Sequence, residues 1–362
     1  MTRYIPLYFV FVVALLLNDV LLSAQDIHFS QFTQSPLSTN PALVGTTPWI
    51  RATLQYRTQW SAVTVAYKTV GASFDIKSKK KWIKGNNKKD KERHAGENGF
   101  AWGVNLFNDN AGDGRMNSLQ ACGSIAYQIY MDERNMIALG FQGGILQRTL
   151  TYSKLYWGSQ YDPLSATGYN AALPADQAVV SADKSFIIPD LATGGVYSYK
   201  RDEQNMFSSD QREINIGFAL FHVNMPRYSY YDSNERLYQR LVLHGNAVVG
   251  IRYTHIAIVP GFMLQRQGPN QEILVGSLVR YTLRDDSKYT GYIKSTSISA
   301  GGYYRNKDAF ILAGLLEFSN YAVGLSYDLN VSGLARASSG RGGLEFTFRY
   351  LNIGAAPLMK NK

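Results

Sequence analysis

The chain contains few residues of the kinds that perform catalysis or bind metals. A nucleophile elbow of the form G-x-S-x-G does not occur in the sequence. The segment Gly112-Asp113-Gly114 predicts a turn and not a phosphate-binding loop, because no helical pattern follows it. The single cysteine and the five histidines do not have the spacing of metal-binding pairs: Cys122, His28, His94, His222, His244 and His255. We therefore predict no catalytic residue, no metal site and no cofactor, and a protein that is not an enzyme. A hydrolase stays open as an unsupported alternative.

Two segments concentrate the residue types that dominate protein–protein contacts, namely tyrosine, tryptophan and arginine. They are Thr151–Ile188 and His222–Arg240, which we expect to be long loops. The predicted partner-binding patch consists of Tyr156, Trp157, Tyr161, Arg227, Tyr228, Tyr230 and Tyr231. In the alternative interpretation, these aromatic side chains pack the loops into a cap or belong to an interfacial girdle.

A run of basic residues between Lys77 and Arg93 is the strongest local charge feature. One interpretation is a solvated loop. The other is electrostatic docking to an acidic partner or to anionic lipid headgroups.

The elements that position these loops are short segments of alternating polarity. In Trp49–Arg57, Ile50 and Leu54 share one face, whereas Arg51 and Arg57 share the other. Successive side chains of a strand point to opposite faces, so this segment is amphipathic only as a β-strand.

The same pattern recurs along the chain and predicts about fourteen strands joined as antiparallel hairpins. Many segments approach the ~10 residues that cross a bilayer at a tilt. Further predicted strands are Val63–Ile76, Met136–Arg148, Leu191–Tyr199, Ile256–Gln265, Glu272–Thr282, Ser297–Arg305, Ala309–Phe318, Tyr321–Asn330 and Gly343–Tyr350. Predicted turns include Asn108–Asn110, Asp132–Arg134, Asn306–Asp308 and Ser319-Asn320. A sandwich would need two domains and a linker, and a propeller would need a blade repeat, so an all-β transmembrane barrel is the predicted fold.

The first residues predict a compartment outside the cytoplasm. Arg3 precedes the apolar run Tyr4–Leu17, and Ser23-Ala24 offers small residues for cleavage, which is the pattern of a signal peptide. A retained membrane anchor is the alternative, although Asn18 shortens the run below the ~20 residues of a span. The formal charge of +10 is typical of nucleic-acid binding, but the predicted signal peptide argues against that interpretation.

These features divide the chain into a signal peptide at 1–24, a polar segment at 25–48, a barrel at 49–350 and a C-terminal tail at 351–362. The proline-punctuated polar segment is a possible plug in the lumen, and a loose tail below the barrel is the alternative. With a periplasmic N-terminus, strand parity places both long loops outside the cell. The polar strand faces carry charges of both signs, which suits a barrel interior.

The segment after the signal peptide resembles the opening of the PorP/SprF family of type IX secretion proteins. The matching residues are Gln25, Asp26, Phe29, Ser30, Gln31, Pro36, Asn40, Pro41 and Gly45. Tyr56–Trp60, Gly103–Asp109 and Tyr327-Asp328 are similar to later elements of that family, so the resemblance covers the mature chain.

The resemblance implies an integral protein of the bacterial outer membrane that contacts outer-membrane lipid and not nucleic acid. It further implies partners among type IX secretion components, or a large secreted surface adhesin that is exported or anchored, in some members for gliding motility. A passive channel or small-solute transporter is the alternative function from a different class.

Overall fold

The computed structural model is a closed barrel of antiparallel strands. It describes residues 26–46, 50–60, 65–78, 98–112, 114–151, 155, 157–170, 172–174, 184–201, 211–230, 234–284, 295–333 and 340–352. The fourteen strands are β1 Ile50–Gln59, β2 Tyr67–Lys77, β3 Gly99–Ala111, β4 Met116–Tyr130, β5 Asn135–Leu150, β6 Lys184–Arg201, β7 Arg212–Phe221, β8 Arg240–Gly250, β9 Ile256–Gln267, β10 Asn270–Arg284, β11 Thr296–Arg305, β12 Ala309–Phe318, β13 Tyr321–Asn330 and β14 Arg341–Asn352. The predicted fold and strand number are confirmed.

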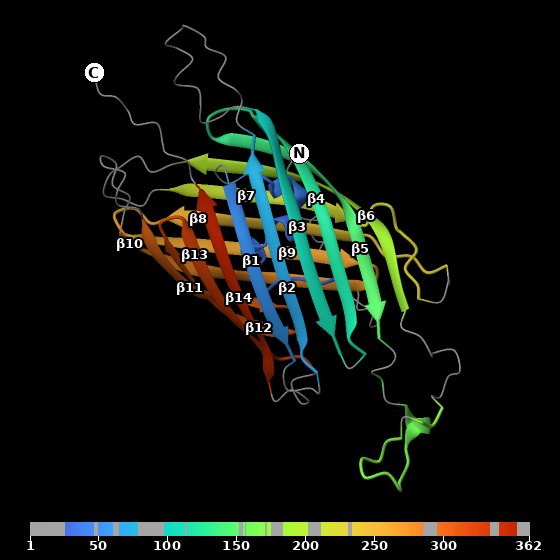
Figure 1. Cartoon of the computed structure of the whole chain (residues 1–362). Helices are drawn as coiled ribbons and strands as arrows, with labels where there is room; N and C mark the ends of the chain where they lie inside the picture. Colours follow the sequence, from blue (N-terminus) through green and yellow to red (C-terminus); the bar gives the residue numbers. More distant parts are fainter. Residues whose placement is uncertain are drawn as a thin grey trace, which may run out of the picture.

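Each strand pairs with its neighbours in sequence, and the first pairs with the last (Figure 1). The closing seam runs from Ile50 opposite Asn352 to Gln59 opposite Gly343. We call the end of the barrel at which β1 begins and β14 ends the terminal end, and the opposite end, which follows β5 and β7, the loop end. Because the sheet closes on itself, the wall has no free strand edge.

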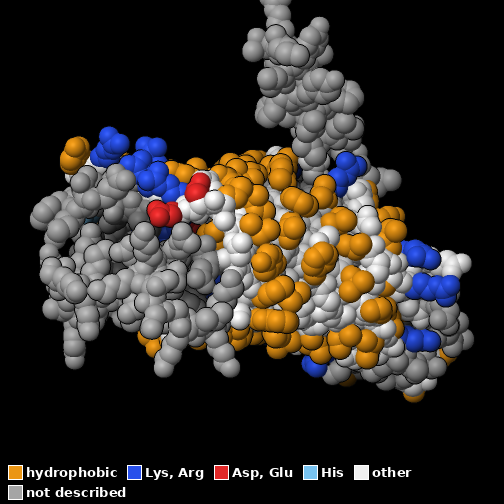
Figure 2. Space-filling view, turned by 90° about the horizontal axis from the view of Figure 1, so that it is seen from above, with side chains coloured by type: hydrophobic (Ala, Val, Ile, Leu, Met, Phe, Trp, Pro, Cys, Tyr) orange, Lys and Arg blue, Asp and Glu red, His pale blue; other side chains and the backbone are white. Residues whose placement is uncertain are grey.

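The wall has polar residues inside and apolar residues outside. In β1, Arg51 and Arg57 are buried, whereas Leu54 is 55% exposed. Figure 2 shows hydrophobic side chains covering the outer wall, with lysine and arginine side chains gathered toward its ends. This arrangement reverses that of a water-soluble protein and fits an apolar solvent around the barrel.

Three predicted boundaries are wrong. The segment Asn108–Asn110 is not a turn but part of β3, because neighbouring strands satisfy its polar side chains. Thr69 donates to Asp109 across β2 and β3 at 2.6 Å, and Asn117 of β4 donates to Asn108 at 2.6 Å.

The other two corrections concern the strands β6 and β2. The strand β6 begins at Lys184 and not at Leu191, so it includes the last residues of the predicted loop Thr151–Ile188. The strand β2 begins at Tyr67, later than the predicted Val63. Of the basic run, Lys77 and Ser78 are described and the remaining residues lie outside the described residues.

Residues 26–46 lie inside the barrel and carry three short helical turns. They are η1 Phe32–Gln34, α2 Pro36–Thr39 and η2 Pro41–Leu43. Proline occupies the first position of both α2 and η2, where its missing N–H costs nothing. None of the helices formed by the described residues is long and apolar enough to cross a membrane.

Small wall residues let these turns approach the strands closely. A Cβ atom at Gly140 of β5 would lie 2.4 Å from the backbone nitrogen of Ala42, so only glycine fits there. Ala42 then packs with Met136, Ala138 and Val196 of the wall. On the opposite side, Phe32 joins a cluster of inward-facing apolar residues of β6 to β12.

The outward face predicts how the barrel responds to charge. Leu325 lies at the middle of β13 and is 53% exposed, whereas Leu329 lies near its end. We expect Leu325→Arg to lower the free energy of unfolding in lipid bilayers by about 2–4 kcal/mol, and Leu329→Arg by only about 0–1 kcal/mol, because the cost rises with depth. Urea titration of both variants measures the difference, and equal costs would contradict the assigned membrane depth.

Candidate functional site

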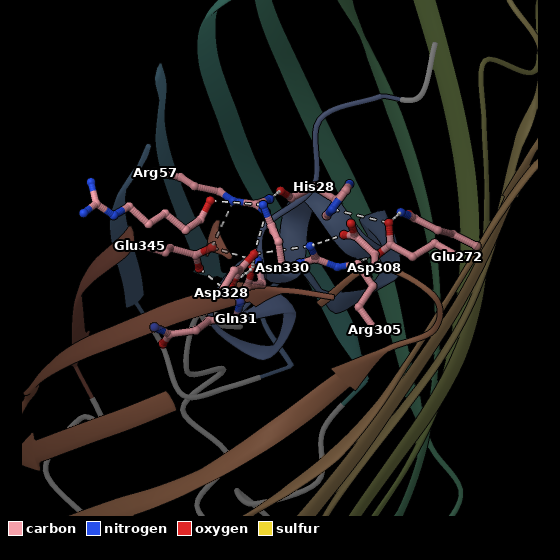
Figure 3. Close-up of polar contacts among 12 residues, drawn as sticks. His28, Gln31, Arg57, Glu272, Arg305, Asp308, Asp328, Asn330 and Glu345 are labelled. Carbon is pink, nitrogen blue, oxygen red and sulfur yellow. Dashed lines mark hydrogen bonds and ion pairs between the residues drawn. The ribbon is translucent and has the colours of Figure 1, made fainter. Parts of the chain in front are cut away.

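The candidate site is the lumen, where charged side chains of five strands converge on the N-terminal segment. They are Arg57 of β1, Glu272 of β10, Arg305 of β11, Asp328 of β13 and Glu345 of β14 (Figure 3). All five are at least nine-tenths buried, because along each strand the side chains alternate between the lumen and the outside, and these five point into the lumen. We call this group the lumenal clamp.

The arginines of the lumenal clamp bridge its carboxylates. Arg57 Nη2 lies 3.0 Å from Asp328 Oδ2, and Arg305 Nη1 lies 3.2 Å from the same oxygen. Arg305 Nε is also 3.6 Å from Glu272 Oε1. Buried charges must be paired, and here two arginines face three carboxylates. The excess carboxylate is available to bind donors from the segment.

Ser30 and Gln31 supply those donors. The backbone N–H groups of Ser30 and Gln31 donate to the two oxygens of Glu345 at 2.7 and 3.1 Å. The Ser30 hydroxyl donates to Asp328 at 2.8 Å and accepts from Arg305 Nη2 at 2.8 Å. Arg57 donates to the carbonyl oxygen of His28. The segment is therefore bound by charge-assisted hydrogen bonds, which are stronger than neutral ones.

His28 enters the same network as a neutral ring. Its Nε2 lies 3.3 Å from Glu272 Oε2. Burial and the nearby guanidinium groups of Arg305 and Arg57 hold the pKa of His28 well below 6.5. The segment thus brings little charge of its own into the lumenal clamp.

A second contact, which we call the outer latch, binds the start of the segment at the loop end. Asp26 contacts His222 Nε2, and Arg240 Nε lies 3.6 Å from the same carboxylate oxygen of Asp26. The other ring nitrogen of His222 lies 2.7 Å from Asp190 of β6. His222 follows β7 with a φ of 56°, a conformation that is uncommon outside glycine.

The ionisation states of the outer latch follow from these contacts. Burial opposes protonation of His222, but Asp26 and Asp190 outweigh it and raise the pKa of His222 to about 9. Burial likewise opposes the charge of Asp26, but His222 and Arg240 lower its pKa below 3.8. At neutral pH, the outer latch is an imidazolium ion between two carboxylates.

The rest of the segment is bound further down the lumen. Asn40 donates to the carbonyl oxygens of Gly195 and Phe218 at 3.1 and 3.0 Å. At the terminal end, Gly45 N–H donates to Asp75 at 2.8 Å, and Arg51 Nε lies 2.7 Å from the same carboxylate group. Residues 26–46 thus run from the loop end to the terminal end with polar contacts throughout.

Beside the segment, the terminal half of the lumen retains a cavity of about 190 Å³. Phe32 and Gln34 line one side, and Arg280, Glu317 and Arg349 line the other. Arg280 and Arg349 share the single carboxylate of Glu317, and Arg349 Nη1 donates to Gln34 at 2.6 Å. Ion pairs between wall residues and one hydrogen bond to the segment therefore border this cavity.

The described motif residues of the predicted family opening lie in the lumen, from Asp26 to Gly45, while Gln25 lies outside the described residues. Phe29 is buried and faces Gly71 of β2. Pro36 and Pro41 are also buried. The sequence missed His222 and Asp190 as partners of the segment, because no local pattern relates them to Asp26.

The structure does not unite the predicted partner-binding residues in one patch. Tyr228 and Tyr230 pack on Phe186 with ring centroids 5.6 and 4.9 Å away. Burial raises the pKa of Tyr228 to about 12, so its hydroxyl group is neutral. Trp157 and the exposed Tyr161 belong to a small unit that projects beyond the loop end (Figure 1).

The remaining predicted contact residues are only partly described. Arg227 is exposed, whereas Tyr156 and Tyr231 lie outside the described residues. In the part of the chain that the structure describes, no group of three or more His, Cys, Asp or Glu side chains is placed to hold a metal ion.

Comparison with known proteins gives one family. The family model described as "Type IX secretion system membrane protein PorP/SprF" matches residues 21–350. No curated protein sequence matches the chain.

Several solved barrels are similar in fold at low sequence identity. The toluene transporter TbuX of Ralstonia pickettii has a TM-score of 0.44 at 10% identity, with 88% of this chain and 93% of that chain covered. A FadL homologue of Pseudomonas aeruginosa has a TM-score of 0.41 at 8% identity, covering 86% and 91%. BamA of Haemophilus ducreyi has a TM-score of 0.39 at 11% identity, covering 83% and 69%.

The lumenal clamp predicts a large cost for losing one arginine. We expect Arg57→Ala to lower the free energy of unfolding by about 3–5 kcal/mol, because it leaves buried carboxylates without their partner. Arg284→Ala, at an exposed position at the end of β10, is the control and should change stability by at most about 0.5 kcal/mol. Urea unfolding measures both, and a neutral Arg57→Ala would contradict the ion network.

The outer latch predicts that residues 26–30 become less protected from hydrogen exchange at alkaline pH. Since folding raises the pKa of His222 from 6.5 to about 9, its stabilisation is complete below pH 6.5 and is lost as the pH rises through 9. The loss is on the order of 3 kcal/mol. Hydrogen exchange at residues 26–30, corrected for intrinsic rates, should therefore accelerate between pH 7 and pH 10. In the control His222→Gln, the exchange should be fast at both values; an unchanged profile in the native chain would refute the imidazolium.

Proposed function

The chain belongs to the PorP/SprF family of type IX secretion system membrane proteins, and we propose that it supports the export or the cell-surface anchoring of a large secreted partner such as an adhesin. It is an integral outer-membrane β-barrel. The proposal extends to gliding motility where the partner is a motility adhesin. It assigns the protein a binding role without catalysis.

The filled lumen is the observation that supports binding over passive transport. The segment 26–46 is bound at the loop end by Asp26, in the middle by Asn40 and at the terminal end by Gly45. A passive channel needs a continuous aqueous path, whereas this lumen holds a buried polypeptide. We therefore propose that residues 26–46 act as a plug, and that the alternative of a small-solute channel is the weaker one.

We propose that the partner binds at the loop end. A closed barrel has no free strand edge that could accept a strand from another protein. Tyr161 and Leu164 of the projecting unit are 67% and 95% exposed, so they offer apolar contact area. With the start of β1 on the periplasmic side, strand parity places this end outside the cell.

The described start of the basic run, Lys77 and Ser78, lies where β2 ends, at the terminal end. In the same orientation this end faces the periplasm. Docking of the run to acidic secretion components or anionic headgroups stays a prediction.

The proposal predicts a closed pore. In planar bilayers we expect the full chain to show no steady open state, because the plug blocks the lumen. A variant without residues 26–46, checked for barrel content by circular dichroism, is the open control. A large steady conductance of the full chain would favour the channel.

The secretion role has its own test. Disrupting the gene should remove type IX substrates from the cell surface, measured by labelling intact cells, and the intact gene should restore them. Unchanged surface labelling would contradict the proposed role.

A further inference from the structure

The connection between β7 and β8 places two arginines directly opposite each other. Arg227 and Arg236 form an isolated antiparallel bridge. The backbone N–H of Leu237 donates to Pro226 O at 3.0 Å, and that of Tyr228 donates to Glu235 O at 2.8 Å. These bonds flank the two arginines, which therefore form a non-hydrogen-bonded pair, the arrangement that brings Cα atoms to ~4.5 Å.

The pair carries two like charges at this short spacing. Both side chains are exposed. Among the described residues, no carboxylate forms an ion pair with either arginine, and the neighbouring Glu235 is also exposed. Like charges directly opposite on two strands destabilise a hairpin. The pair is thus a local cost to folding.

Other contacts hold the hairpin in spite of this repulsion. Leu237 packs in a cluster with Leu146 and Ile188, and Tyr228 joins that cluster. The guanidinium group of Arg148 lies 5.0 Å from the centre of the Tyr228 ring. The arginine pair is therefore fixed in place before any partner arrives, which lowers the entropy cost of binding.

The residues that the hairpin contacts show on which side of the barrel wall Arg227 and Arg236 lie. Leu146 and Arg148 of β5, and Ile188 of β6, are inward-facing residues near the loop end. Through Leu237 and Tyr228 the hairpin is therefore packed on the lumen side of the wall, at the loop end.

From these observations we propose that Arg227 and Arg236 are a docking site for an acidic segment of a secreted protein partner. A carboxylate between two guanidinium groups converts their repulsion into attraction and accepts charge-assisted hydrogen bonds from both. Anionic lipid headgroups carry the same charge, but they lie around the barrel wall and not over its mouth. This inference rests on the proposed function and adds the chemistry of the partner.

The test measures binding of fluorescently labelled hexaglutamate to the full chain in detergent by anisotropy. Replacing both arginines by alanine should weaken binding about tenfold, because two exposed ion pairs are lost. Arg227→Lys with Arg236→Lys should keep most of the affinity. Arg266→Ala, which removes an exposed arginine from the outward face of β9, is the matched control and should leave binding unchanged.

A stability measurement separates recognition from a structural role. The double alanine variant should unfold at the same or a higher temperature than the native chain, because it removes a repulsive pair. A lower unfolding temperature would mean that the arginines stabilise the hairpin and would overturn the proposal.

Two further binding results would also overturn it. One is equal loss of hexaglutamate binding in Arg266→Ala, which marks non-specific attraction. The other is retention of hexaglutamate binding in the double variant together with loss of binding to phosphatidylglycerol vesicles, which marks a lipid site. In cells, a contrary result is that the double variant displays type IX substrates at normal levels while disruption of the gene removes them. That result would refute this docking site and leave the proposed function intact.

Discussion

The constraint on which the structure depends is the reversed polarity of the wall. An apolar surrounding leaves Leu54 and its outward neighbours exposed and forces Arg57 and its inward neighbours into the lumen, where they are buried. Those inward groups are expensive to bury unless they are paired. The wall alone leaves an excess of carboxylate at the lumenal clamp, and the backbone N–H groups of Ser30 and Gln31 bind it. The hydrogen bonds of the segment therefore stabilise buried charges of the barrel's own wall.

This role also explains the composition and the short turns of the segment. It is polar and carries little charge, since His28 is neutral and Asp26 is matched by His222 and Arg240. Its short turns present backbone donors and small side chains to walls that approach closely at Gly140. In a longer regular helix, the N–H groups after the first turn would bond within the helix and could not donate to the carboxylates of the wall. The partner binding that we propose for the loop end is thus distinct from the structural role of the segment in the lumen.

The sequence was sufficient for the strands and insufficient for the pairings between distant residues. Alternation over Trp49–Arg57 predicts both the strand and its inward face, because side-chain direction depends only on the local period. The predicted turn at Asn108–Asn110 failed because its polar side chains are satisfied by other strands, which a local pattern does not register. The contact between His222 and Asp26 spans 196 residues and depends on the register of the whole barrel. The role predicted for the tyrosines of the two long loops stays a prediction.

The separation in sequence between Ser30 and Glu345, 315 residues, has a consequence for how the molecule assembles. The lumenal clamp joins a segment that precedes the first strand to a side chain of the last one. It is complete only when β14 has reached β1 and the circle is shut. If the barrel closed first, the segment would have to enter the closed barrel before it could form any of its contacts. We therefore expect the strands to gather around the segment, so that closing the seam and filling the lumen occur together late in folding.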